Sequence, residues 1–457
     1  MTDVSRTVEA VWRIESPRLV AGLARTLRDI GLAEEVAQEA FVAALEQWPE
    51  QGVPDNPGAW LTTVARRRAV DLVRRERTRD EKYARLAAGL AAPGARSGRG
   101  TTTVAHADDG GAVLVGSVPA TDAIVDDPVG DDLLALVLVA CHPVLPRESR
   151  VALTLRLVGG LTTDEIARAF LVPSATVGQR ISRAKRTLAE ANVPFDVPQA
   201  DELAARIPAA LEVVYLVFTE GYAATSGDTW VRRELAEDAM RLGRVLAGLL
   251  PGEPEVHGLV ALMELQASRF AARTGPGPDG EPVLLEDQDR SRWDRLLVRH
   301  GLAALDRALA LGTRAGKALG PYSLQAAIAA CHARAATWAD TDWEAIVALY
   351  DALASVAPSP VVELNRAVAV GYADGPEAAL VVLDAVADDP RLARHHLYGA
   401  VRGDLLTRLG RHAEAAVVLE SAAGLAPTRH ERQLLLERAA AASSTTGARR
   451  HDVDPAP

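Results

Sequence analysis

The sequence has few aromatic residues and only two cysteines, and each scarcity excludes a class of protein. Phe, Trp and Tyr make up 4% of the 457 residues, although hydrophobic residues as a whole make up 48%. β-Sheets draw on aromatic and β-branched residues, so a chain rich in Ala and Leu favours helices. Cys141 and Cys331 cannot build a disulfide framework, which is typical of proteins in a reducing cytoplasm.

Targeting segments and catalytic motifs are also missing from the sequence. Residues 1–15 have no apolar core of the signal-peptide type, and no apolar run is long enough to span a bilayer. There is no P-loop, no GxSxG motif and no HExxH motif. The Cys-His pairs at 141–142 and 331–332 lack compact zinc spacing, and we interpret them as core residues. We expect a cytoplasmic protein without catalytic residues, metal, cofactor or membrane contact.

Charge is unevenly distributed along the chain. The net charge of −11 excludes a protein that coats nucleic acid along its whole length. Residues 66–79 nevertheless contain seven arginines against Asp71 and Glu76, and a second basic cluster lies at 180–186. This pattern predicts two basic surfaces on an otherwise acidic protein.

The apolar periodicity divides the chain into five parts and predicts an all-α fold. Helical spacing covers residues 8–90, resumes at 129–192 and continues over 193–442. Residues 91–128 are rich in Gly, Ala and Thr without an apolar period, which predicts a flexible linker. Residues 443–457 are predicted to be a disordered tail.

Residues 160–188 carry the pattern of a helix-turn-helix. Thr162 or Thr163 can cap a first helix, a turn follows, and Ser174 can cap a second helix that enters the major groove. The alternative is an ordinary helical hairpin with a solvated charged face. The side chains expected to contact base edges are Ser174, Thr176, Gln179, Arg180 and Arg183, and those expected to contact phosphates are Lys185 and Arg186.

The other basic stretch follows a Trp-Leu pair on one predicted helix. Such a helix suits phosphate contacts together with base stacking on opened single strands. The alternative is a solvated Arg-rich face with Trp60 in the core, and for Trp60 itself we favour the core. The candidate DNA-binding residues here are Trp60, Arg66, Arg67, Arg74 and Arg75.

The order of these features resembles the extracytoplasmic-function (ECF) group of sigma factors. An acidic helix at 34–48 is followed by the basic helix, the linker and the helix-turn-helix. The resemblance implies that 60–75 melts and reads the upstream edge of the promoter bubble, and that 160–188 is region four. It implies core RNA polymerase and promoter DNA as partners. The residues it assigns to polymerase binding are Glu34, Glu35, Gln38, Glu39 and Phe41. At Arg67, many members have Asn.

The second half of the chain resembles an ECF subgroup with a large extension of TPR-like repeats. The resemblance rests on FTEGY at 218–222, QDRSRWD at 288–294, TDW at 341–343 and SPVVELNRAVA at 359–369. Similar segments begin at residues 343, 376 and 412, about one TPR length apart. In family terms, the extension regulates the sigma factor, with a regulatory protein or ligand binding there.

Two other functions remain open at this point. In a one-component regulator, the repeats would sense a ligand and the helix-turn-helix would bind an operator, but the acidic and basic helices would have no task. In a helical-repeat hydrolase, the aspartates of QDRSRWD and TDW would supply carboxylates. We favour helix caps and salt bridges for those aspartates.

Overall fold

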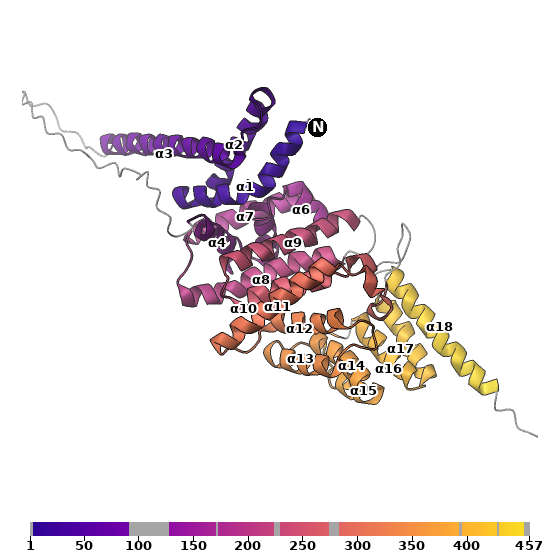
Figure 1. Ribbon diagram of the computed structural model, residues 1–457. Coiled ribbons are helices and arrows are strands. Elements are labelled where there is room, and N and C mark those ends of the chain that lie inside the picture. Colours follow the sequence, from indigo (N-terminus) through magenta and orange to yellow (C-terminus); the bar gives the residue numbers. More distant parts are fainter. Residues whose placement is uncertain are drawn as a thin grey trace, which may run out of the picture. The chain divides into compact units, whose positions relative to one another are not determined.

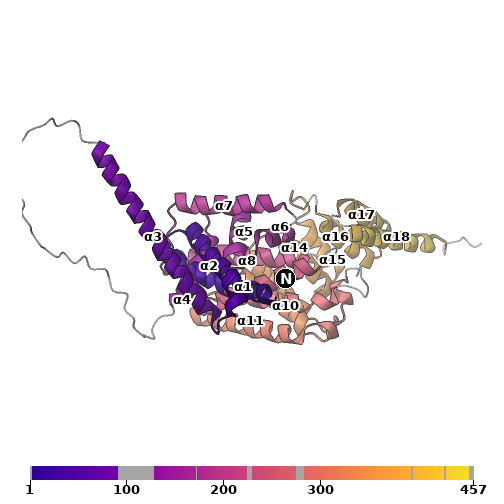
Figure 2. The ribbon, with the colours of Figure 1, turned by 90° about the horizontal axis from the view of Figure 1, so that it is seen from above.

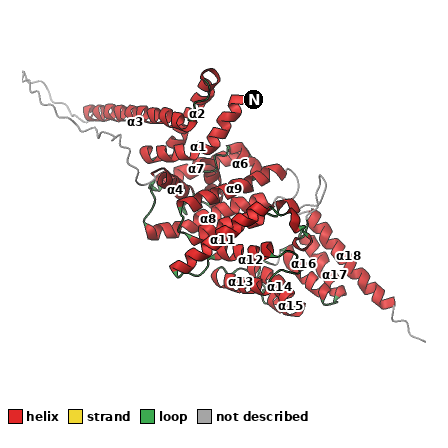
Figure 3. Cartoon of the chain, viewed as in Figure 1, coloured by secondary structure: helices red, strands yellow, loops and turns green. Residues whose placement is uncertain are grey.

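The computed structural model describes residues 3–90, 128–170, 172–223, 229–273, 283–392, 395–426 and 429–451. Within these ranges the chain forms helices and loops and no strand (Figure 3). The predicted all-α fold is therefore confirmed. Among the same residues, no helix combines the length and apolarity that a membrane span requires.

The chain divides into two compact units whose limits cross the predicted domains. The first unit comprises Met1–Thr162 and Gly178–Arg206, and the second comprises Thr163–Val177 and Ile207–Pro457. The limits predicted from sequence (8–90, 129–192 and 193–442) remain predictions. The predicted linker at 91–128 lies outside the described residues except for Pro128, where a helix begins.

In the first unit, α1 packs against four other helices (Figure 1). Asp29 caps α2 by accepting a hydrogen bond from the Leu32 N–H, and Asn56 accepts one from the Ala59 N–H at the start of α3. The long α3 extends well beyond α1 and α2 (Figure 2). The helices are α1 (Asp3–Leu27), α2 (Ile30–Gln51), α3 (Pro57–Leu90), α4 (Pro128–Ala140) and α5 (Arg147–Leu157).

Both helices expected within residues 160–188 are present. They are α6 (Thr163–Ala169) and α7 (Ser174–Glu190), and α8 (Ala200–Ala223) follows. Along α7, the buried side chains recur at helical spacing, at Val177, Ile181, Ala184 and Leu188. This apolar stripe leaves the remaining faces of α7 to polar residues.

The second unit begins with a bundle centred on α10, which is buried along most of its length and packs against α9, α11 and α12. Gly258 on α10 allows the close packing against α12, because a Cβ there would clash with the Ser323 Oγ and backbone. The elements are α9 (Thr229–Leu249), α10 (Pro254–Ala267), η1 (Phe270–Ala272), η2 (Leu285–Asp287), η3 (Arg290–Arg292), α11 (Arg295–Ala315) and α12 (Pro321–Arg334).

Three successive helix pairs follow, as the repeated segments predict. Each segment start coincides with the first helix of a pair, and neighbouring helices pack consecutively. A core containing Leu364, Leu383 and Leu405 joins the pairs. The pairs are α13 (Trp343–Val356) with α14 (Pro360–Ala373), α15 (Pro376–Asp384) with α16 (His396–Arg408), and α17 (His412–Leu425) with α18 (Arg429–His451).

At the C-terminus, the structure differs from the prediction of a disordered tail over 443–457. Helix α18 continues to His451, and 452–457 lie outside the described residues. Ala439 and Ala442 on this helix are buried, and alanine favours helix propagation.

The aspartates considered for hydrolysis act as helix caps, as we favoured from the sequence. Asp294 accepts hydrogen bonds from the Leu296 and Leu297 N–H groups at the start of α11. Asp289 caps η3, and Asp342 caps α13. Since these oxygens accept from backbone N–H groups, they are structural at these positions.

Candidate functional site

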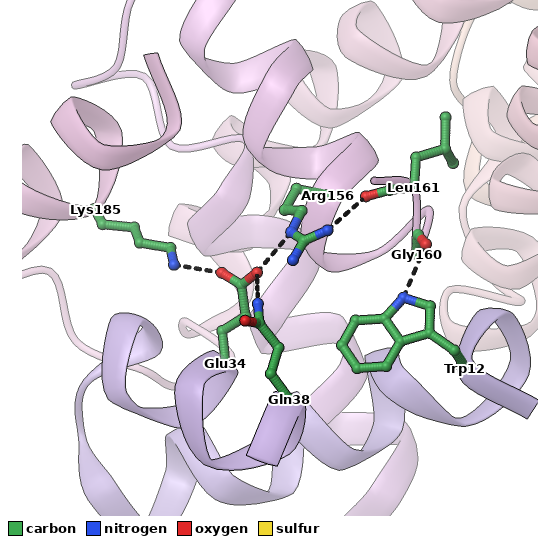
Figure 4. Close-up of polar contacts among 7 residues, drawn as sticks. All are labelled: Trp12, Glu34, Gln38, Arg156, Gly160, Leu161 and Lys185. Atoms are coloured by element: carbon green, nitrogen blue, oxygen red, sulfur yellow. Dashed lines mark hydrogen bonds and ion pairs between the residues drawn. The ribbon is translucent and has the colours of Figure 1, made fainter. Parts of the chain in front are cut away.

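The buried carboxylate of Glu34 is the centre of a polar cluster in the first unit (Figure 4). Its side chain is only 5% exposed. One oxygen accepts from the Arg156 Nε at 2.6 Å and from the Gln38 Nε2 at 2.7 Å, and the other pairs with the Lys185 Nζ. A buried charge is costly without partners, so these donors are what make the position tolerable.

The surroundings of the cluster fix Arg156 in place. Its Nη1 donates to the Leu161 carbonyl at 3.1 Å, and its guanidinium lies 5.9 Å from the centre of the Trp12 ring. Trp12 in turn donates through Nε1 to the Gly160 carbonyl at 3.0 Å (Figure 4). Gly160 has a φ of +72°, a conformation that disfavours a side chain. Two side chains of the cluster and its surroundings, Arg156 and Trp12, are therefore held by hydrogen bonds to the backbone at residues 160–161.

Electrostatics keeps Glu34 ionised in this site. Burial alone would raise the pKa of the carboxyl group, but the charges of Lys185 and Arg156 and their hydrogen bonds outweigh burial and hold the pKa below its ordinary value. The carboxylate therefore stays charged at neutral pH and attracts both cations.

Among the predicted polymerase-binding residues, exposure varies. Glu35 and Glu39 are exposed, and Glu39 forms a salt bridge with Arg68 at 3.4 Å. Gln38 is half-buried and Glu34 is buried in the cluster. Phe41 is a core residue that packs edge-on against Trp12, with ring centres 4.5 Å apart. Only Glu35 and Glu39 are thus open to a partner in this arrangement.

The basic helix α3 presents its predicted arginines to solvent. Arg66, Arg67, Arg74 and Arg75 are all exposed. Trp60 is partly buried and packs edge-on against Trp48, with ring centres 5.5 Å apart. Whether Trp60 contacts DNA or only packs in the core stays a prediction.

The predicted DNA-reading residues lie mostly on the solvent side of α7. Ser174, Gln179, Arg183 and Arg186 are exposed, whereas Thr176, Arg180 and Lys185 are half-buried. Some of these groups already have partners.

The Ser174 hydroxyl donates to Asp164 at 2.6 Å, and Arg186 lies 3.7 Å from Glu190. Lys185, whose contact with phosphate stays a prediction, is paired with Glu34 in this structure.

Sequence reasoning missed Arg156 and Trp12 as members of the cluster. Arg156 lies in the apolar stretch ALTLRLVGG, where a charged residue in a buried helix requires a partner. That isolated charge was a usable signal, but nothing in the sequence identified Glu34 as its partner.

The cysteines and histidines suggest no metal centre in the described part of the chain. Those residues contain no group of three or more His, Cys, Asp or Glu side chains placed to hold a metal ion. Cys141 is buried, with its Sγ 3.2 Å from the Thr154 hydroxyl, and burial raises the pKa of its thiol to about 11.

Comparison with known proteins identifies the two parts that the cluster joins. Residues 13–79 match sigma-70 region 2, and residues 135–188 match sigma-70 region 4. Glu34 thus belongs to region 2, and Arg156 and Lys185 belong to region 4. Residues 206–309 match a family of unknown function, DUF6596.

One relative matches about nine tenths of this chain, and two others match over about a third of it. An uncharacterised protein of Rhizobium meliloti is 42% identical over 415 residues, which is 91% of each chain. The ECF RNA polymerase sigma factor SigK of Mycobacterium ulcerans is 30% identical over 175 residues, 37% of this chain and 78% of SigK. SigK of Mycobacterium tuberculosis is 30% identical over 168 residues, 36% of this chain and 74% of its own length. Two sigma-70 regions and this coverage of SigK show that the chain belongs to the ECF RNA polymerase sigma factors and carries an additional helical domain after region 4.

Proposed function

We propose that this protein binds core RNA polymerase in the cytoplasm, directs it to promoters, and is regulated by its own C-terminal domain. The polymerase performs the chemistry, so the sigma factor needs no catalytic residue of its own. The exposed Glu35 and Glu39 on α2 contact a basic surface of the polymerase. The exposed arginines of α3 act at the promoter bubble, and α7 reads the upstream element.

The observation that supports a closed state of the free protein is the Glu34 cluster. It joins region 2 to region 4 through the buried Glu34 carboxylate and two cations. These cations belong to Arg156 and Lys185, which follow Glu34 by 122 and 151 positions in the sequence. We assign polymerase binding to α2 and phosphate contact to Lys185. In the cluster, the Glu34 carboxylate of α2 and the Lys185 ammonium group are paired with each other and are not available to those partners. We infer that this is the closed, resting arrangement of the free protein, which separates when polymerase binds.

The C-terminal domain is connected to region 4 through α6. This helix packs against α9, and the first turn of α7 belongs to the same compact unit. A domain that holds the first helix of the helix-turn-helix can shift the balance between closed and open arrangements, provided that it contacts the two states differently. This contact supports a regulatory role over that of a passive tail.

Run-off transcription with purified core polymerase tests the proposal. The full-length protein should confer transcripts that begin at specific promoters, and core polymerase alone should not. A one-component regulator would alter transcription only when another sigma factor is supplied. Transcripts that depend on a second sigma factor would therefore reject the proposed function.

A further inference from the structure

The second compact unit contains an open pocket of about 470 Å³, lined mainly by the helical pairs. Its walls come from η2, the loop that carries Trp338, and the helices α14, α16 and α18. The volume falls in the range of sites that hold one small organic molecule. Most of the walls lie beyond residue 309, where the last family match ends.

The pocket has an apolar wall with an aromatic end. Leu397 on α16 and Leu434 on α18 line it and are exposed to solvent, although both are large hydrophobic residues. Trp338 and Tyr372 form the aromatic end, with ring centres 5.2 Å apart. Tyr372 is held from behind by Trp343, stacked at 4.4 Å. Apolar side chains left open in a concave site favour an apolar ligand.

The polar groups around Tyr372 are largely committed to one another. The Tyr372 hydroxyl donates to the Glu286 carboxylate at 2.8 Å. Arg408 donates to the Gly371 carbonyl, and its guanidinium lies 4.8 Å from the centre of the Tyr372 ring. Burial, the hydrogen bond to Glu286, and the charges of Glu286 and Asp404 all raise the pKa of Tyr372. The phenol therefore remains protonated and acts as a hydrogen-bond donor.

Among the carboxylates near Tyr372, Asp404 is the one without a hydrogen-bond donor in the described part of the chain. It lines the pocket and is half-buried. The pocket lining carries four carboxylates, Glu286, Asp404, Glu431 and Glu437, against the guanidinium groups of Arg408 and Arg438. Since Arg408 is already engaged, the charge favours a cation.

A buried nitrogen adds an independent sign of a missing partner. His396 lines the same pocket, and its Nε2 is buried without a hydrogen-bond partner. A carboxylate oxygen of Glu431 lies 3.7 Å from this nitrogen, beyond hydrogen-bond distance. Buried polar atoms without partners are uncommon in native structures and call for an explanation such as an absent ligand.

We propose that this pocket binds a small amphipathic ammonium ion. The apolar body lies along Leu397 and Leu434 against Trp338, and the ammonium group lies at Asp404 and Glu286. The ligand is a free small molecule, because the pocket has the volume for one such molecule and walls from five segments. This site goes beyond the proposed function and does not depend on it.

Three probes with the same apolar body test the charge requirement. Isothermal titration of the full-length protein with 4-phenylbutylammonium, 4-phenylbutanol and 4-phenylbutyrate compares a cation, a neutral molecule and an anion. The proposal predicts that the cation binds at least about tenfold more tightly than either other probe, since a charged hydrogen bond typically contributes this much. Equal binding of the three, tighter binding of the anion, or no binding of the cation would overturn it.

Variants locate the binding to this pocket. Asp404→Asn should weaken binding of the cation by about tenfold and leave binding of the alcohol unchanged. Glu420→Gln, on the exposed face of α17 and outside the pocket, should change neither. Circular dichroism checks that both variants are folded. If Asp404→Asn binds the cation as tightly as the unchanged protein, the site is wrong. If only a lysine-containing peptide binds and the free amine does not, the small-molecule assignment is wrong.

Discussion

At the scale of single residues, Glu34 combines two roles that normally exclude each other. As a residue of region 2 it was expected to face the polymerase, yet its carboxylate is buried against two cations of region 4. A buried ion pair is a poor source of stability compared with apolar packing, but removing one member leaves the others unpaired and costly. Such a cluster suits a contact that specifies one arrangement.

Glu34→Gln should destabilise the first unit by about 3 kcal/mol, because Arg156 and Lys185 would keep their charges without a counter-ion. Urea unfolding of the full-length protein, followed at a probe in the first unit, measures the change. Glu35→Gln is the matched control, since Glu35 is the exposed neighbour on the same helix. Its effect should stay within about 0.5 kcal/mol. Equal stability of the two variants would show that the cluster is energetically neutral.

The pH dependence of the same contact follows from the direction of its pKa shift. The pKa of Glu34 in the folded protein lies below the ordinary value of 4.5. The stability that it contributes is therefore fully present above about pH 4.5 and is lost as the pH falls through the lowered pKa.

The difference in stability between the unchanged protein and Glu34→Gln should thus be constant from about pH 7 to 5 and shrink under more acidic conditions. Unfolding curves of both proteins across this range provide the measurement. The two proteins have all other carboxyl groups in common. If the difference in their free energies of unfolding does not change with acid, Glu34 is not ionised in the folded protein.

At the scale of elements, α7 has one buried apolar stripe, and the basic side chains outside this stripe differ in how far they are exposed. Arg186 is exposed beside Glu190, whereas Arg180 is half-buried near the N-terminal half of the helix. Arg186→Ala should weaken binding to all promoter sequences alike and lower the salt slope by roughly one unit. Arg180→Ala should relax preference at one or two base pairs by roughly 1–3 kcal/mol each. Binding of the two variants to a mutated promoter library distinguishes these effects. Identical binding profiles would show that the assigned orientation of α7 on DNA is wrong.

The exposed acidic face of α2 gives a further prediction. Reversing the charge of both Glu35 and Glu39 to Lys should weaken association with core polymerase and make the remaining binding less sensitive to salt. A pull-down titration at several salt concentrations measures this. Glu420→Lys on α17, a helix of the second compact unit, serves as a control with the same kind of charge reversal. Unchanged affinity in the double variant would remove α2 from the polymerase interface.

The sequence predicted elements well and contacts between them poorly. Apolar spacing identified α6 and α7, and repeated segments identified the starts of α13, α15 and α17. These features are local, because helix periodicity and capping depend on residues a few positions apart. The pairing of Glu34 with Arg156 and Lys185 spans more than a hundred residues, and no local pattern specifies it. The division of compact units inside α7 was likewise not predictable from period or composition.

At the scale of the whole molecule, the C-terminal domain is expected to alter promoter-specific transcription. Truncation after about residue 195 removes α9, the helix that packs against α6, and should either raise or lower the yield of promoter-specific transcripts. Circular dichroism and thermal unfolding must first show that the truncated protein is folded. If a folded truncated protein transcribes like the full-length protein across salt and protein concentration, the domain does not regulate and is better interpreted as a docking platform.

In the proposed function, regions 2 and 4 are held together in the free protein and separate on polymerase. Spin labels at Glu46→Cys on α2 and Ser182→Cys on α7, both exposed positions, report the distance between the regions once Cys141 and Cys331 are replaced by serine. Electron–electron distance measurements should give one narrow, short distribution for the full-length free protein. A longer distribution should appear when core polymerase is added, and Glu34→Gln should shift the free protein in the same direction. A broad distribution in the free protein, or one that polymerase leaves unchanged, would contradict the account.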